Sequence, residues 1–222
     1  MNLSQSITPS WAANLTRALP TVFIVDDDVS VRESLELLVR FSGWHPELFA
    51  TGRDFLSRPR ASGPSCLVCD VTLPDLNGLD LQQLVADRYE MPIIFISGYG
   101  DVPMTVRAMK AGAVEFLTKP FGDEVLLSAI RHAIDRSDSA LRRAAKVRVL
   151  QDRYELLTRR EREVMSLVVA GKLNKQVAGD LGISEITVKA HRGKMIEKMK
   201  ADSLADLVRI AATLRIAPIA DA

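Results

Sequence analysis

The chain has 222 residues, 47% of them hydrophobic and 26% charged, and its formal net charge is +1. This composition is ordinary for globular domains, and the length allows one large domain or two smaller ones. No apolar run approaches the length of a membrane-spanning helix, and residues 1–20 lack the basic start and apolar core of a signal peptide. We therefore expect a cytoplasmic protein without a membrane partner, preceded by a flexible leader over residues 1–20.

The nearly neutral total conceals an uneven distribution of charge along the chain. Residues 21–125 carry 16 acidic and 9 basic side chains, a net charge of −7. Residues 158–200 carry 10 basic and 5 acidic side chains, a net charge of +5. An acidic first part and a basic second part indicate two domains with different partners, and the basic charge favours nucleic acid as the partner of the second.

Short apolar runs alternate with helical patterns in the first part of the chain. The runs predict strands at residues 21–25, 47–50, 66–70, 92–97 and 114–118. The helical patterns cover residues 29–42, 52–58, 78–89 and 103–111, and a fifth begins near residue 123. This alternation predicts an α/β fold with a doubly wound, five-stranded parallel sheet covered on both faces. Ligands of such sheets bind beyond the carboxyl ends of the strands.

The two cysteines, Cys66 and Cys69, invite a redox or metal interpretation because they are three residues apart. They fall within a predicted strand, where residues three apart point to opposite faces and cannot easily bridge or share a metal. No second cysteine pair exists in the sequence. We therefore predict that both are core thiols.

Polar side chains follow four of the predicted strands. Asp26 and Asp27 follow the first strand, Asp70 ends the third, Ser97 ends the fourth, and Lys119 follows the fifth. Carboxylate oxygens suit Mg²⁺, while a lysine and a hydroxyl suit phosphate oxygens. Any one of these residues could be a helix cap or a solvated side chain. Their combination at the ends of parallel strands predicts a site for magnesium and phosphate.

The segments "VDDD", "CDVTLPDLNG", "ISGYGD" and "EFLTKPF" resemble the receiver domain of two-component response regulators, over residues 21–138. The match is nearest to the FixJ branch of that family. The resemblance implies that Asp70 accepts a phosphoryl group from a sensor histidine kinase. It also implies that Mg²⁺ is held by Asp26, Asp27, Asp70 and the backbone carbonyl of Thr72.

The same resemblance assigns roles near the fourth and fifth strands. Ser97 and Lys119 would contact the phosphoryl group, Ser97 and Phe116 would form a conformational switch, and the bond before Pro120 would be cis. Attack of a carboxylate on phosphorus gives an acyl phosphate, so the domain would support its own phosphotransfer and dephosphorylation without independent enzymatic turnover. An aspartyl-phosphate phosphatase is the enzymatic alternative, but it would usually place a second aspartate where this chain has Thr72.

The basic second part predicts four helices. Thr158 and Glu161 form a capping box, a second helix covers residues 174–181, and Gly182 and Ser184 form a turn and cap before a third helix. Two helices joined by a short turn with glycine are typical of a helix-turn-helix, although a plain helical bundle is the alternative. A glycine inside the second helix, Gly179, suggests close helix packing.

The third helix combines an apolar stripe with basic side chains, and "LTRREREV", "NKQVAGDLGIS" and "TVKAHRGKM" resemble the LuxR-type DNA-binding domain. We assign this domain to residues 156–222. The residues expected to face DNA are Lys175, Thr187, Lys189, Arg192 and Lys194. The last helix carries an apolar stripe that resembles the dimerisation helix of the family, although core packing alone could also explain it: Leu204, Leu207, Val208, Ala211 and Ala212.

Residues 139–155 contain neither proline nor glycine and predict a helical linker between the domains. Within and just after it, Val147, Leu150, Tyr154 and Leu157 have a spacing that suits pairing of helices. A flexible linker with local helix is the alternative.

Together these features predict a phosphorylation-dependent transcription regulator. The expected partners are a sensor histidine kinase, promoter DNA, a second copy of the phosphorylated chain and RNA polymerase, and the expected cofactor is Mg²⁺. The alternative is a receiver protein whose helical module binds another protein instead of DNA; the basic third helix disfavours it.

Overall fold

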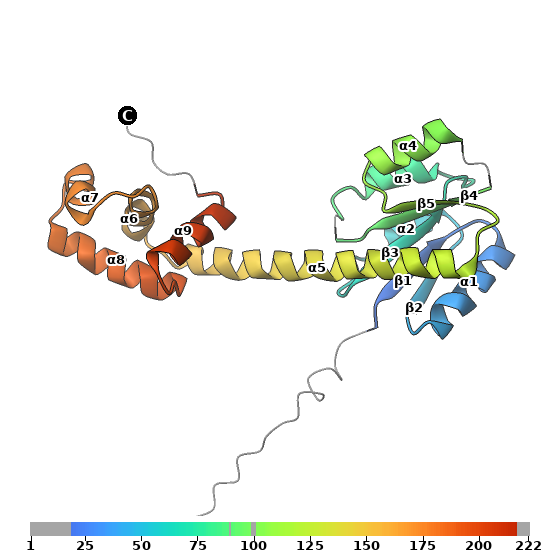
Figure 1. The fold of residues 1–222 in the computed structure, drawn as a ribbon, viewed down its shortest axis with the longest axis horizontal. Helices are drawn as coiled ribbons and strands as arrows, with labels where there is room; N and C mark the ends of the chain where they lie inside the picture. The colour runs from blue at the N-terminus through green and yellow to red at the C-terminus, as the bar shows by residue number, and fades with distance from the viewer. Residues whose placement is uncertain (1–18, 89, 99–100, 217–222) are drawn as a thin grey trace, which may run out of the picture. The chain divides into compact units, whose positions relative to one another are not determined.

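The computed structural model describes residues 19–88, 90–98 and 101–216. The chain divides into two compact units, with the boundary between Leu141 and Arg142 (Figure 1). Most of the predicted leader lies outside the described residues. Within the described ranges, no helix combines the length and the apolar character that crossing a membrane would require.

The first unit is built on a five-stranded parallel sheet, with the order β2-β1-β3-β4-β5. Its strands are β1 (Thr21–Val25), β2 (His45–Phe49), β3 (Ser65–Asp70), β4 (Ile93–Ser97) and β5 (Glu115–Thr118). The register pairs Val25 with Cys69, Asp70 with Ile96, and Ser97 with Thr118. The predicted fold class is confirmed, and the carboxyl ends of β1, β3, β4 and β5 meet at one edge of the sheet.

Helices cover both faces of this sheet and create two apolar cores (Figure 1). They are α1 (Val29–Phe41), α2 (Gly52–Ser57), α3 (Gly78–Leu84), α4 (Val102–Lys110) and the first half of α5 (Asp123–Glu155). Cys69 belongs to the core beneath α2, α3 and α4, while Cys66 belongs to the core beneath α1 and α5. Both thiols are free and fully buried, and burial raises the pKa of each. The prediction of two core thiols on opposite faces is confirmed.

Helix α3 is shorter than the sequence predicts. It was expected to reach Tyr89, which lies outside the described residues, but it ends at Leu84. Beyond it the amides of Ala86 and Arg88 bond to carbonyls three residues back, which is the geometry of tight turns. Val85 is buried at this point, so packing of its side chain accompanies the change from helix to turn.

The second unit contains the second half of α5 and four further helices, α6 (Arg159–Val169), α7 (Asn174–Leu181), α8 (Glu185–Met199) and α9 (Leu204–Thr213). They enclose a single apolar core. The predicted apolar stripe of α8 lies in this core, since Val188, Met195 and Met199 are fully buried.

Local capping signals set the boundaries of these helices. Thr158 and Glu161 form the predicted capping box, with each side chain accepting a hydrogen bond from the backbone amide of the other. Gly182 ends α7 in the left-handed region at φ 63°, and the hydroxyl of Ser184 caps α8. The expectation for Gly179 is wrong, because a Cβ at that position would meet nothing within 4 Å.

Helix α5 continues without interruption for 33 residues, so the boundary between the units falls inside a helix. Three of the four side chains predicted to suit pairing of helices pack within the second unit, and the fourth, Val147, is not part of its core. Leu157 is buried in the core of the second unit, and Leu150 and Tyr154 pack against that core. This stripe therefore anchors the last turns of α5 to the second unit.

A buried ion pair joins α6 to α8. The side chain of Glu161, only 3% exposed, accepts hydrogen bonds from Nζ of Lys198 at 2.7 Å and from the Thr158 amide at 2.9 Å. Burial raises the pKa of Glu161, but these donors outweigh it and hold the pKa below its ordinary value. A lowered pKa stabilises the fold above the unfolded-state value, and that contribution is lost as the pH falls through the folded-state value.

We predict that Glu161→Gln lowers the free energy of unfolding of the second unit at pH 7 by about 1–3 kcal/mol, because Lys198 loses its charged partner while the capping box is retained. The difference from the wild type should shrink as the pH falls below about 4.5, the ordinary pKa of this side chain. Urea unfolding of the full chain, followed by far-UV circular dichroism, measures both effects. Tryptophan fluorescence reports on the first unit, because residues 142–222 contain no tryptophan.

Glu163→Gln is the matched control, since Glu163 pairs only with the more exposed Arg159 and Arg160 in the described structure. It should cost less than about 1 kcal/mol. Equal costs for the two variants, or a cost for Glu161→Gln that does not change with pH, would contradict the role of the buried pair.

Candidate functional site

Three carboxylates gather at the carboxyl edge of the sheet. Asp26 follows β1 and is fully buried, Asp27 is exposed, and Asp70 ends β3 with 7% of its surface exposed. One oxygen from each lies within 4.8 Å of the other two. Three negative charges this close repel one another and require a cation among them.

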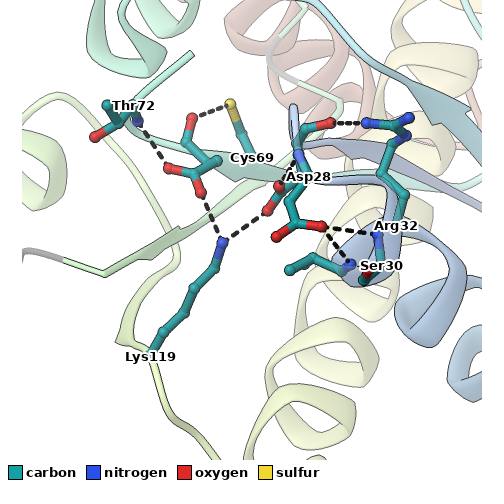
Figure 2. A network of polar contacts seen from close by, with 9 residues as sticks. Asp28, Ser30, Arg32, Cys69, Thr72 and Lys119 are labelled. Atoms are coloured by element: carbon teal, nitrogen blue, oxygen red, sulfur yellow. Dashed lines mark hydrogen bonds and ion pairs between the residues drawn. The ribbon is translucent and has the colours of Figure 1, made fainter.

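Lys119 supplies one positive charge. The Lys119–Pro120 peptide bond is cis, as predicted, and Nζ of Lys119 donates to Oδ2 of Asp26 at 2.8 Å and to Oδ2 of Asp70 at 2.7 Å (Figure 2). Burial lowers the pKa of Lys119, but the two carboxylates outweigh it and the net pKa is raised. Burial also raises the pKa of Asp26, only partly opposed by its bond to Lys119. A single lysine thus links the ends of β1 and β3.

Backbone contacts separate the roles of the consecutive aspartates. Oδ1 of Asp26 accepts from the amide of Asp28 at 2.9 Å, and the Asp26 carbonyl accepts from Nη1 of Arg32 at 2.6 Å. The side chain of Asp28 instead accepts from the amide of Ser30 at 2.8 Å and caps α1 (Figure 2). The run of aspartates therefore contains one helix cap and two carboxylates that contribute to the cluster.

The carboxylate of Asp70 is fixed at both oxygens. Oδ1 accepts from the amide of Thr72 at 2.7 Å, and Oδ2 is held by Lys119 (Figure 2). Ser97 is fully buried at the end of the neighbouring strand, and its backbone carbonyl accepts from the Lys119 amide at 2.8 Å. Phe116 on β5 is partly buried, with its ring centroid 6.3 Å from that of Phe95. The structure thus brings Asp26, Asp27, Asp70 and Lys119 together and places Ser97 at the same sheet edge.

Sequence reasoning missed Gly78, which lies directly behind Asp70. Its amide donates to the carbonyl of Val71 at 2.9 Å. A Cβ at position 78 would lie 2.6 Å from the Asp70 carbonyl oxygen and 3.0 Å from Cα of Val71. Only glycine permits this approach, which sets the first turn of α3 against the strand end that carries Asp70. The Asn-Gly pair before an apolar helix was the available signal.

Sequence reasoning also missed Asp75, in the loop after β3. Its two carboxylate oxygens accept from the amides of Gly52 at 3.1 Å and Arg53 at 3.0 Å, at the start of α2. Burial raises the pKa of Asp75, but these backbone donors outweigh it and the net pKa is lowered. The loop that follows Asp70 is thereby tied to a second helix.

The side chains expected to face DNA fall into two groups. Lys189 and Lys194 on α8 and Lys175 at the start of α7 are exposed. Arg192 is partly buried and donates from Nη1 to Oδ1 of Asn174 at 3.0 Å, and the Thr187 hydroxyl bonds to that of Ser184 at 2.8 Å. The second group therefore also holds α7, α8 and the intervening turn together.

Comparisons with known proteins match each unit to a family of domains. The model of the response regulator receiver domain matches residues 22–131, and the model of the bacterial regulatory proteins of the luxR family matches residues 155–211. Nodulation protein W of Bradyrhizobium diazoefficiens is 49% identical over 88% of this chain and 86% of its own length. The chain belongs to the response regulators of two-component systems. It is a transcription regulator whose activity depends on phosphorylation.

Further relatives place this response regulator near the predicted branch. The transcriptional regulatory protein FixJ of Rhizobium meliloti is 42% identical over 86% of this chain and 94% of its own length. The solved structure of the response regulator StyR is 44% identical, with a TM-score of 0.76 over 88% of this chain and 99% of StyR. The predicted resemblance to the FixJ branch and to the LuxR-type domain is confirmed.

We predict that Gly78→Ala lowers the free energy of unfolding of the first unit by about 1–3 kcal/mol, because the new methyl group would overlap backbone atoms. The amide resonances of Asp70, Val71 and Thr72 should also shift, since the strand end must move. Tryptophan fluorescence in urea measures the stability, and backbone NMR of the full chain measures the shifts.

Gly63→Ala is the control, because a Cβ at position 63 would meet nothing within 4 Å. It should change neither quantity appreciably. If both alanine variants behaved alike, the close approach of α3 to β3 would not be what fixes this strand end.

Proposed function

We propose that Asp70 is the phosphoacceptor and that a sensor histidine kinase is the donor. The observation that carries this proposal is the position of Lys119, whose ammonium group lies between Asp70 and the buried Asp26. An oxygen of Asp70 attacks phosphorus, the bond to the donor histidine nitrogen breaks, and an acyl phosphate forms. Lys119 then offsets the negative charge of the phosphoryl oxygens, and the Ser97 hydroxyl contributes a further contact.

The donor set at this edge fits a magnesium ion. Asp26, Asp27 and Asp70 present hard carboxylate oxygens close together, the ligand type that Mg²⁺ prefers, and we propose the Thr72 carbonyl as a further ligand. When bound, the ion would neutralise charge on the phosphoryl oxygens. The protein's own contribution is to hold Asp70 between the amide of Thr72 and Lys119, so that the carboxylate is oriented before the donor arrives.

We propose that Ser97 and Phe116 transmit phosphorylation to the surface. A turn of the Ser97 hydroxyl toward the phosphoryl group would make room for Phe116, which is partly buried beside Phe95. The surface affected would include α4, where Val102 and Val106 are exposed by 76% and 43%. Burial of such apolar side chains against a second chain would favour the dimer.

The C-terminal unit is proposed to place α8 in the major groove of promoter DNA. Lys189 and Lys194 would lie toward the DNA, Lys175 would contact the backbone, and Thr187 and Arg192 would contact DNA from the edge of the helix. The exposure of the three lysines supports this placement. The opposing possibility, a helical module that binds only protein, does not account for the basic face of α8.

Helix α9 offers a surface for a homodimer of the phosphorylated chain. Its predicted stripe is divided in the structure. Leu207 and Ala211 are buried in the core, while Leu204, Val208 and Ala212 remain exposed at positions four residues apart. A symmetric dimer through the exposed residues would present two copies of α8, which requires half-sites about 10 base pairs apart or a multiple of that.

The remaining assignments follow from these roles. We propose that the protein acts in the cytoplasm, where kinase, promoter and RNA polymerase are all available to it. Its chemistry is proposed to be limited to its own phosphorylation and dephosphorylation. An aspartyl-phosphate phosphatase is disfavoured because Thr72 occupies the position at which such an enzyme would carry a second aspartate.

We predict that Asp70→Asn abolishes labelling by a phosphohistidine donor, because an amide is not a nucleophile. Asp27→Asn should slow labelling and weaken its dependence on Mg²⁺, since one metal ligand is lost. Radiolabel transfer from a phosphorylated histidine kinase, with and without EDTA, measures both. Asp80→Asn is the control, because Asp80 is exposed on α3. Undiminished labelling of the Asp70 variant would show that the phosphoacceptor lies elsewhere.

We predict that Lys189→Ala and Lys175→Ala weaken DNA binding in different ways. If Lys189 reads a base, its loss should cost about 1–3 kcal/mol at one operator position and relax the preference there. Loss of a phosphate contact at Lys175 should weaken all duplexes alike and reduce the salt slope by about 1. Fluorescence anisotropy across operator variants and salt concentrations separates these results, with Lys110→Ala in the first unit as control. Unchanged affinity for both variants would remove α7 and α8 from the DNA interface.

A further inference from the structure

Ile186 is a large hydrophobic residue on the surface of the second unit. It lies in the first turn of α8, and 80% of its surface is exposed. Among the described residues of the second unit, no other large hydrophobic side chain is exposed to this extent. A single exposed hydrophobic residue is ordinary on protein surfaces, so the exposure of Ile186 alone does not indicate a binding site. The residues that surround it on the helix provide the further evidence.

The face of α8 that carries Ile186 is otherwise made of small residues. Ala190 and Gly193 follow at spacings of four and three, which places all three on one side of the helix, and all are exposed. Lys189 and Lys194 are exposed beside them. An apolar strip bordered by two cations is therefore presented outward, while the opposite face of α8 is buried in the core.

Gly193 leaves the backbone of α8 uncovered on this face. Glycine is unfavourable inside a helix, yet a Cβ at position 193 would meet nothing within 4 Å. Packing within the described structure therefore gives no reason for a glycine here. Because glycine has no side chain, a surface that meets α8 here can come closer to the helix backbone than any other residue would permit.

We propose that Ile186 recognises the 5-methyl group of a thymine in the major groove, and that Ala190 and Gly193 allow α8 to lie close to the base edges. The inference rests on the proposed entry of α8 into the major groove. Residues in the first turns of a recognition helix are those that contact base edges. Thymine alone among the bases presents an apolar group there, and the Ile186 side chain has no hydrogen-bonding atom to offer any other edge.

Thymine-to-deoxyuridine substitution tests this proposal because it removes only the methyl group and preserves base pairing. The full chain would first select tight-binding duplexes from a random pool. Each thymine in a selected duplex would then be replaced singly. Wild-type protein should lose affinity about fourfold at one position per half-site. This is the effect expected when the burial of one methyl group, that of the thymine, is lost from the interface. Ile186→Ala should bind the thymine and deoxyuridine duplexes equally at that position and retain any sensitivity at others.

Leu156→Ala is the matched control, since Leu156 is also an exposed aliphatic residue, at 66%, but lies outside α8. It should keep the wild-type profile at every thymine. Gly193→Ala provides a second measurement. This variant should unfold at a higher urea concentration than the wild type, because alanine favours helix, and yet bind the selected duplexes more weakly.

The outcomes distinguish failure of this inference from failure of the proposed function. If the full chain binds no duplex, or binds duplexes with an affinity that does not depend on salt, the proposed DNA binding by α8 is wrong. The inference about Ile186 then fails with it. If duplexes are bound but Ile186→Ala keeps the wild-type deoxyuridine profile, DNA binding stands and the role of Ile186 is overturned. Unchanged DNA affinity of Gly193→Ala would likewise overturn the close approach of α8.

Discussion

The first unit depends on keeping several carboxylates close together at one edge of a sheet. Asp26, Asp27 and Asp70 approach within 4.8 Å, and Lys119 offsets part of the resulting repulsion by bonding to two of them. The arrangement is possible because β1, β3 and β5 run parallel and end at the same edge. Burial of Asp26 makes its negative charge costly and raises its pKa, so the site favours a further cation that would balance the remaining negative charge.

The loop and helix after β3 hold Asp70 in this environment. Gly78 lets α3 begin against the backbone of Asp70 itself, and Asp75 caps α2 from the same loop. Gly78 acts through the backbone of β3 and Asp75 through the backbone of α2, and both limit how far the strand end can move. A chemical change at Asp70 therefore acts on a segment tied to two helices, which gives a local event a route to the surface.

The second unit divides α8 between structure and recognition. Val188, Met195 and Met199 fill the core, while the bond from Arg192 to Asn174 fixes α8 relative to α7. The opposite face carries Ile186 and the exposed lysines, which are free of those structural demands. A helix held this firmly can present apolar and charged groups to DNA with little loss of side-chain or backbone order on binding.

The sequence alone determined the features that depend on short-range signals. These include the strand ends with Asp26, Asp70 and Lys119, the capping box at Thr158, and the family to which the chain belongs. Alternating apolar runs and caps involve residues close in the chain, so their pattern is sufficient to predict them. Only the tertiary structure showed that Asp75 caps α2 and that the stripe on α9 is divided between core and surface. Those features depend on which faces meet when distant segments pack, and the spacing of residues along one helix or loop does not specify that.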